Sequence, residues 1–140
     1  MSNSYEQLTG YLYNDAAVLI GKGYSGQPPH KNDPSAENMR GIGPIPFGTY
    51  TIVELIQNDG KLGPYVLVLE PDATTRQRIL EFDRDPDTFR CHGERETPPP
   101  GYASDGCIVM PRAVREMLWT GTDHIIDVVV QLETDHGIQS

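Results

Sequence analysis

The sequence Phe-Arg-Cys-His-Gly at residues 89–93 is followed, after a proline-rich loop, by Ser-Asp-Gly-Cys-Ile-Val-Met at residues 104–110. A cysteine acts as a nucleophile in its thiolate form, and a nearby imidazole is the commonest group that generates one. Gly106 lets the backbone bend sharply before Cys107, and amides in such a bend can point at a developing oxyanion. These segments predict Cys107 as nucleophile, His92 as base, and the Gly106 and Cys107 amides as oxyanion donors.

The residues beside this pair receive roles of their own. A backbone carbonyl near Gly93 can accept the imidazole N–H and fix the tautomer of His92, in place of the carboxylate of a triad. Ser104 can donate a hydrogen bond to the thiolate or substrate, or can simply stabilise the turn, and the sequence leaves both open. Adjacent residues of a strand point to opposite faces, so we expect Cys91 to face away from His92 as a buried structural thiol.

A structural zinc site and a papain-like peptidase fit this pattern less well. Cys91, His92 and Cys107 supply at most three ligands, whereas structural zinc takes four, typically in spaced pairs. Papain-like peptidases place the cysteine before the histidine, and the order here is reversed. We therefore expect no metal and no organic cofactor.

The order of histidine and cysteine resembles the signature of the L,D-transpeptidase (YkuD-type) catalytic domain, whose cysteine lies in a Ser-x-Gly-Cys-Ile turn. Upstream, Gly-Tyr-Ser-Gly at 23–26, Asn-Asp-Pro at 32–34 and Gly-Pro-Ile-Pro-x-Gly-x-Tyr at 43–50 are similar to the branch that type VI secretion systems deliver as antibacterial effectors. The resemblance runs from about Tyr11 to the final predicted strand. It therefore covers most of the chain.

Two positions depart from the L,D-transpeptidase pattern. Many members carry Ser-His-Gly-Cys-Ile-Arg, whereas this chain has Asp105 in place of the second histidine and Val109 in place of the arginine. The effector branch resembles this chain in having an acidic residue before the glycine. Recognition of the substrate carboxylate thus lacks its usual arginine, and Arg112 is our candidate for that role. Tyr24, Ser25 and Asp105 are the further candidates for substrate binding.

The resemblance implies a cysteine-dependent L,D-carboxypeptidase or L,D-transpeptidase that acts on peptidoglycan tetrapeptide stems. The enzyme would remove or exchange the terminal D-alanine through a thioester. An antibacterial toxin of this kind also implies an immunity protein and a secretion-apparatus partner. A housekeeping cell-wall L,D-transpeptidase and a non-catalytic peptidoglycan-binding module on the same scaffold are the alternatives. The balance between hydrolysis and transfer is left open by the sequence.

The composition fits a single domain over residues 1–140. Fourteen glycines and twelve prolines favour a loop-rich β protein over a helical bundle. The net charge of −9 disfavours nucleic acid and anionic membranes as partners. No apolar run approaches the roughly 20 residues that span a bilayer, and the N-terminus lacks the regions of a signal peptide. We expect synthesis in the cytoplasm and, given the resemblance, action in the periplasm of target bacteria.

Hydrophobic patterns predict a mainly antiparallel β-sandwich or small barrel with one short helix after Cys107. A hairpin is expected from Leu8–Tyr13 and Ala16–Gly21 around Asn14-Asp15. Further strands are expected at residues 48–56, 65–70, 88–92 and 125–132, while residues 76–82 fit a strand or a helical turn.

A loop, a helix and a tail complete the prediction. Residues 23–46 lack periodicity, and we expect this loop to lie over the active site with Tyr24, Ser25 and His30 near the substrate. Pro111 suits the first position of a helix that ends at Gly121. Ala113, Val114, Met117 and Leu118 fall at helical spacing within it. Residues 134–140 are expected to form a tail.

Overall fold

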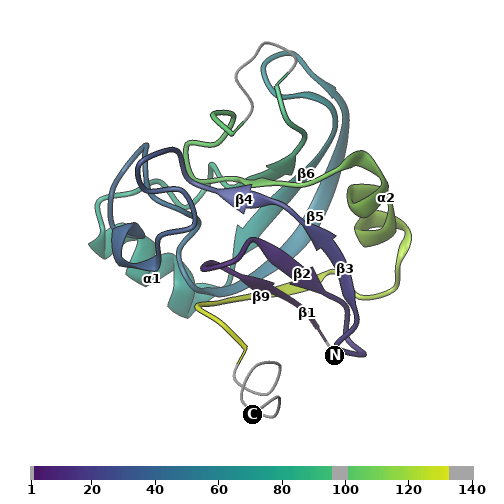
Figure 1. The fold of residues 1–140 in the computed structure, drawn as a ribbon, viewed down its shortest axis with the longest axis horizontal. Coiled ribbons are helices and arrows are strands. Elements are labelled where there is room, and N and C mark those ends of the chain that lie inside the picture. Colours follow the sequence, from purple (N-terminus) through teal and green to yellow (C-terminus); the bar gives the residue numbers. More distant parts are fainter. Residues whose placement is uncertain (1, 96–100, 133–140) are drawn as a thin grey trace.

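The computed structural model describes residues 2–95 and 101–132, which form one curved sheet with two α-helices packed against it (Figure 1). The strands are β1 (Asn3–Glu6), β2 (Tyr11–Tyr13), β3 (Leu19–Lys22), β4 (Tyr24–Ser25), β5 (Gly48–Asp59), β6 (Gly63–Pro71), β7 (Arg90–His92), β8 (Ile108–Val109) and β9 (Ile125–Val129). The helices are η1 (Pro34–Ala36, a 3-10 turn), α1 (Ala73–Glu81) and α2 (Arg112–Thr120).

The sheet curls until its two edges meet at Gly23. Its strand order is β3-β2-β1-β9-β5-β6-β7-β8-β4, yet a single residue separates the edge strands β3 and β4 in the chain. A Cβ at Gly23 would lie 1.9 Å from the Val109 carbonyl oxygen, so backbone from both edges passes this point. The pairs β1·β9 and β7·β8 are parallel, and the other pairs are antiparallel. The predicted mainly β fold is confirmed, as a mixed sheet.

The long antiparallel pair β5 and β6 forms the centre of the sheet. β6 carries consecutive buried residues from Tyr65 to Leu67, because α2 packs against this strand. The predicted central strand at 65–70 is confirmed, and the strand predicted at 48–56 continues to Asp59. At the turn between them the Asp59 carboxylate accepts hydrogen bonds from the N–H groups of Lys61 and Leu62, at 2.8 and 2.9 Å.

The ambiguous segment at 76–82 belongs to a helix. α1 begins after Asp72, whose carboxylate caps the helix by accepting from the Thr75 N–H at 2.9 Å. Its buried residues are Thr75 and Ile79, so the apolar stripe was too narrow to show as a helical period. The described residues therefore contain two α-helices, where the sequence predicted one. After α1, Asp83 takes a positive φ of 59° and turns the chain back toward the sheet.

The predicted helix after Cys107 is confirmed as α2. Val114 and Leu118 are buried as predicted, whereas Ala113 and Met117 face solvent. The predicted N-terminal hairpin is also present, as β2 and β3. Its loop spans residues 14–18 instead of two residues, because the side chain of Asn14 accepts from the N–H groups of Ala16 and Val18. The predicted tail at 134–140 lies outside the described residues.

The core offers a matched pair of tyrosines for a stability test. Tyr50 and Tyr5 are both fully buried. The Tyr50 hydroxyl donates to the Pro46 carbonyl at 2.7 Å, whereas the Tyr5 hydroxyl has no hydrogen-bond partner among the described residues. Tyr50→Phe should lower the free energy of unfolding by about 1–3 kcal/mol, because it leaves a buried carbonyl unpaired.

Tyr5→Phe is the control for this experiment. It removes an unpaired hydroxyl and should change the free energy of unfolding by less than about 0.5 kcal/mol, or raise it. Urea denaturation of both variants measures the difference. Equal losses in the two variants would contradict the assignment of a stabilising hydrogen bond to Tyr50.

Candidate active site

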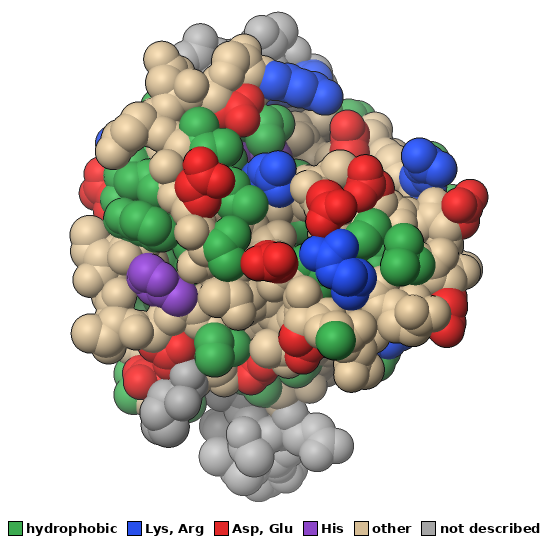
Figure 2. Space-filling model, turned by 180° about the vertical axis from the view of Figure 1, so that it is seen from behind, with side chains coloured by type: hydrophobic (Ala, Val, Ile, Leu, Met, Phe, Trp, Pro, Cys, Tyr) green, Lys and Arg blue, Asp and Glu red, His purple; other side chains and the backbone are tan. Residues whose placement is uncertain are grey.

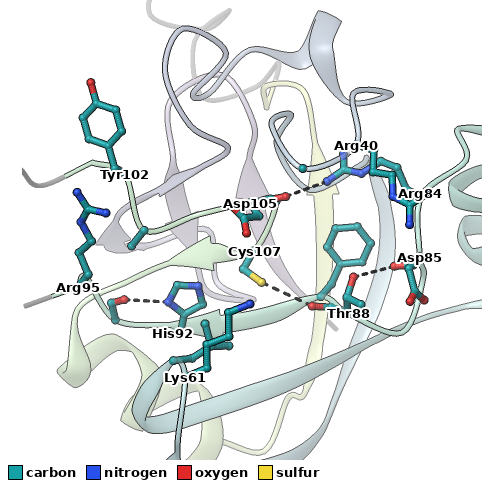
Figure 3. Close-up of a pocket in the computed structure, with 16 residues that line it drawn as sticks. Arg40, Lys61, Arg84, Asp85, Thr88, His92, Arg95, Tyr102, Asp105 and Cys107 are labelled. Carbon is teal, nitrogen blue, oxygen red and sulfur yellow. Dashed lines mark hydrogen bonds between the residues drawn. The ribbon is translucent and has the colours of Figure 1, made fainter.

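His92 and Cys107 line one pocket of about 580 Å³ (Figure 3). Four segments supply its walls: residues 40–41, residues 61–62 in the β5–β6 turn, residues 84–95 and residues 102–107. Parallel pairing of β7 with β8 brings the histidine and the cysteine segments together, with Cys91 opposite Ile108 and His92 opposite Val109. The structure therefore places the predicted base and nucleophile in the same cavity.

A single backbone contact orients the imidazole of His92. Its Nδ1 lies 2.8 Å from the carbonyl oxygen of Gly93, and a carbonyl can only accept, so Nδ1 carries the hydrogen. The other ring nitrogen, Nε2, then holds a free lone pair. Burial lowers the pKa of His92 below its usual range, so the ring is neutral at pH 7. The carbonyl contact expected from the sequence is thus present, and it leaves Nε2 able to take a proton.

The thiol of Cys107 is protonated in the free protein. Burial raises the pKa of Cys107 to about 11, although contacts with Arg90 and the charge of Arg84 oppose the rise. Its Sγ donates a long hydrogen bond of 3.6 Å to the Thr88 carbonyl, and Figure 3 shows the sulfur between Thr88 and His92. The pocket thus holds a neutral thiol and a neutral imidazole, so a nucleophilic role for Cys107 would require proton transfer to accompany the attack.

The Ser104 hydroxyl uses all its hydrogen-bonding capacity within the turn. It accepts from the N–H groups of Gly26 and Gly106, at 2.9 and 3.0 Å, and donates to the Cys107 carbonyl at 2.6 Å. One donor and two acceptor sites are thereby filled, so its hydrogen is not available to a thiolate or substrate. The turn-stabilising alternative fits Ser104. The Gly106 N–H is engaged as well, which leaves the Cys107 N–H as the remaining predicted oxyanion donor.

The long loop reaches the pocket, but through other residues than predicted. Arg40 and Gly41 line the cavity, whereas Tyr24, Ser25 and His30 do not. Ser25 is fully buried, and its hydroxyl donates to the Gly106 carbonyl at 3.2 Å while accepting from the Ile45 N–H. The Tyr24 hydroxyl binds the Glu94 carboxylate at 2.8 Å. His30 pairs with Asp33 at 3.1 Å. These side chains bond to neighbouring segments and do not line the cavity.

Arg112 lies away from the pocket, contrary to the role proposed for it. Its Nε donates to Glu116 at 3.0 Å along the exposed face of α2, and its guanidinium stacks 4.4 Å from the centroid of the Tyr65 ring. Asp105, by contrast, does line the pocket as expected and accepts a hydrogen bond from Gln27 at 3.0 Å.

Sequence reasoning missed a group of cations around the pocket. The charged side chains among its 16 lining residues are Arg40, Lys61, Arg84 and Arg95 against Asp85 and Asp105. The whole chain has 11 basic and 20 acidic residues, so the pocket reverses the charge balance of the protein. The four cations lie in separate segments, and no local motif connects them. Their placement favours an anionic ligand.

The second cysteine behaves as predicted. Cys91 is fully buried within the hydrophobic core, and both cysteines are free thiols. Burial raises the pKa of Cys91 to about 12. It is therefore a packing residue on the face of β7 that His92 does not use.

Comparison with known families adds a finding independent of this geometry. The family model of the Tlde1 domain matches residues 20–131. The chain belongs to this family of type VI secretion effector domains. A search among curated proteins gave no match. The effector branch of the sequence resemblance is thus confirmed, while the L,D-transpeptidase activity stays a prediction.

The pKa of Cys107 makes a direct chemical prediction. Only a small thiolate fraction exists at pH 7, so alkylation of the folded protein by iodoacetamide should be slow there. Its rate should rise about tenfold per pH unit as the pH approaches the raised pKa. Mass mapping of the alkylated peptide gives the rate at Cys107. Cys107→Ala is the control, because the buried Cys91 should stay unlabelled. A rate already constant above pH 7 would instead indicate a preformed thiolate–imidazolium pair.

Proposed function

We propose that this effector domain is a cysteine-dependent L,D-carboxypeptidase or L,D-transpeptidase acting on peptidoglycan tetrapeptide stems. The observation that carries the proposal is that the Cys107 thiol lines the same pocket as a His92 ring whose Nδ1 is held by the Gly93 carbonyl, which leaves Nε2 to accept a proton. A neutral imidazole with a fixed tautomer is suited to general-base activation of a neutral thiol. The resemblance of the surrounding sequence to L,D-transpeptidases supplies the substrate class.

The proposed reaction begins with attack on the peptide carbonyl before the terminal D-alanine. Nε2 of His92 takes the thiol proton as Sγ of Cys107 bonds to the carbonyl carbon, and the carbonyl oxygen takes the negative charge. The Cys107 N–H would donate to that oxygen. Collapse of the tetrahedral intermediate breaks the C–N bond, and His92 returns the proton to the leaving amine. The product is a thioester on Cys107.

A second nucleophile then releases the thioester. Water gives a free carboxylate, which is the carboxypeptidase reaction, and an amine gives a new amide, which is transpeptidation or exchange with a free D-amino acid. His92 takes the proton from the attacking group and returns it to the sulfur as the C–S bond breaks. Both outcomes use the same residues.

The charge of the pocket supports a peptide that carries carboxylates. A tetrapeptide stem ends in a free α-carboxylate next to the bond that would be cleaved. Arg95 and Lys61 lie near His92, and Arg40 lies across the pocket (Figure 3). Neither Lys61 nor Arg95 forms an ion pair with another described residue, so both can bind an anionic ligand without first breaking an ion pair.

The effector family supports a delivery role and a neutralising partner. As a toxin carried by a type VI apparatus, the domain would act in the periplasm of target bacteria and be blocked by an immunity protein in the producer.

In the described part of the chain no helix is long and apolar enough to cross a membrane. Figure 2 shows acidic, basic and apolar side chains interspersed over one face of the molecule.

Purified muropeptides test the activity directly. Incubation with the protein, with and without a free D-amino acid, should convert tetrapeptide stems to tripeptide stems or to stems with an exchanged terminal residue. Mass spectrometry resolves both products by mass. Cys107→Ala should lower turnover by at least about a thousandfold, because the proposed thioester cannot form without the Cys107 thiol. Unchanged stems with the unmodified protein would favour the non-catalytic binding module.

Charge variants test which cations recognise the substrate. Lys61→Gln and Arg95→Gln should each raise KM for tetrapeptide stems about three- to tenfold with a smaller change in kcat, because each removes a cation from the pocket without altering the catalytic pair. Arg112→Gln is the matched control and should leave both constants unchanged, since Arg112 lies outside the pocket. A raised KM in the Arg112 variant alone would restore the original assignment.

A further inference from the structure

Arg84 is a buried arginine that bonds to two separate segments of backbone. Its side chain lies in the wall of the pocket and its exposed fraction is 6%. Nη1 donates to the carbonyls of Glu37 and Pro44 at 2.6 and 2.9 Å. Nη2 donates to those of Gly43 and Asp105 at 3.3 and 3.5 Å. The first three acceptors belong to the long loop, and the fourth belongs to the turn that carries Cys107.

The charge of Arg84 is balanced without an ion pair. Among the described residues no carboxylate forms a salt bridge with it. Burial lowers the pKa of Arg84, and a buried cation is unfavourable unless polar groups surround it. Here backbone carbonyl dipoles fill that role, together with the Phe89 ring, whose centroid lies 5.3 Å from the guanidinium carbon. A guanidinium has five N–H donors in a rigid planar fork, whereas a lysine ammonium has three donors at a single nitrogen on a flexible chain.

The same guanidinium explains why glycine precedes Cys107. Gly106 has a φ of +132°, and a Cβ built there would lie 2.2 Å from Nη2 of Arg84. Any side chain at this position would displace the guanidinium. The absence of a side chain at Gly106 therefore lets the Arg84 guanidinium lie close to the backbone.

We propose that Arg84 is a positioning residue that fixes the 37–44 loop against the catalytic turn and so keeps water from the thioester. Figure 3 shows Arg84 and His92 on opposite sides of Cys107, so the guanidinium holds the wall that His92 does not. This inference rests on the proposed function. The fate of the thioester depends on access of water. Ser25 and Gln27 also connect the long loop to this turn, but Arg84 alone bonds to the carbonyls of Glu37, Gly43 and Pro44 among the described residues, so we expect water access to depend on it.

Two variants separate the fork of hydrogen bonds from the charge. Arg84→Met removes both and keeps a similar length, and Arg84→Lys keeps the charge alone. Arg76→Met is the matched control, because Arg76 makes ion pairs with Glu70 and Asp87 outside the pocket. In both Arg84 variants the ratio of hydrolysis to D-amino-acid exchange should rise at least about threefold, and in the control it should not change. This ratio does not depend on the fraction of active protein.

Hydrogen exchange supplies a readout that needs no activity. Amides of residues 38–43 should exchange faster in both Arg84 variants, while β5 and β6 keep their protection. If Arg84→Met does not fold, Arg84→Lys carries the test. The positioning role of Arg84 would be overturned by unchanged exchange in the loop or by an unchanged product ratio. It would also be overturned if Arg84→Lys behaved like the unmodified protein in both measurements. Absence of any product from the unmodified protein would contradict the proposed function. The exchange data would still show whether Arg84 fixes the loop.

Discussion

The turn that carries Cys107 depends on buried side chains that bond to backbone. Ser104 bonds to Gly26, Gly106 and Cys107 through one hydroxyl, and Ser25 links Gly106 to the long loop. Residues 101–107 belong to no strand or helix, so their polar backbone groups need partners of this kind. Cys107 is therefore placed by hydroxyl and guanidinium donors, with β8 beginning only at the next residue.

This construction explains how an irregular segment can hold the Cys107 side chain in place. A buried hydroxyl with three partners has one orientation, and removing it would leave several backbone groups unpaired at once. The neighbouring sheet adds its own constraint, because parallel pairing of β7 with β8 sets the register between the histidine and the cysteine segments. The chemistry of the pocket thus rests on one strand pair and a small set of buried polar contacts.

Much of this arrangement follows from local sequence. Glycine, proline and alternating apolar residues predicted a mainly β fold, and the central strand and α2 followed from their own patterns. α1 escaped because only Thr75 and Ile79 of the helix are buried. The location of His92 and Cys107 in one pocket was predictable from a motif. The position of Arg112 outside the pocket and the hydrogen bonds of Arg84 to the long loop were not. Both features depend on which distant segments of the chain come into contact, and the spacing of residues within one segment does not indicate that.

The pocket has more cationic than acidic side chains, whereas the whole chain is acidic. In a protein of net charge −9, a pocket with more cations than acids attracts carboxylates and leaves the surrounding surface to repel them. Yet these cations do not outweigh burial at the thiol, whose pKa remains raised. Only a small fraction of Cys107 is therefore thiolate in the free protein at pH 7. In the proposed reaction, activation would require a substrate close enough for bond formation to accompany proton transfer to His92, which would restrict acylation to ligands that fit the pocket.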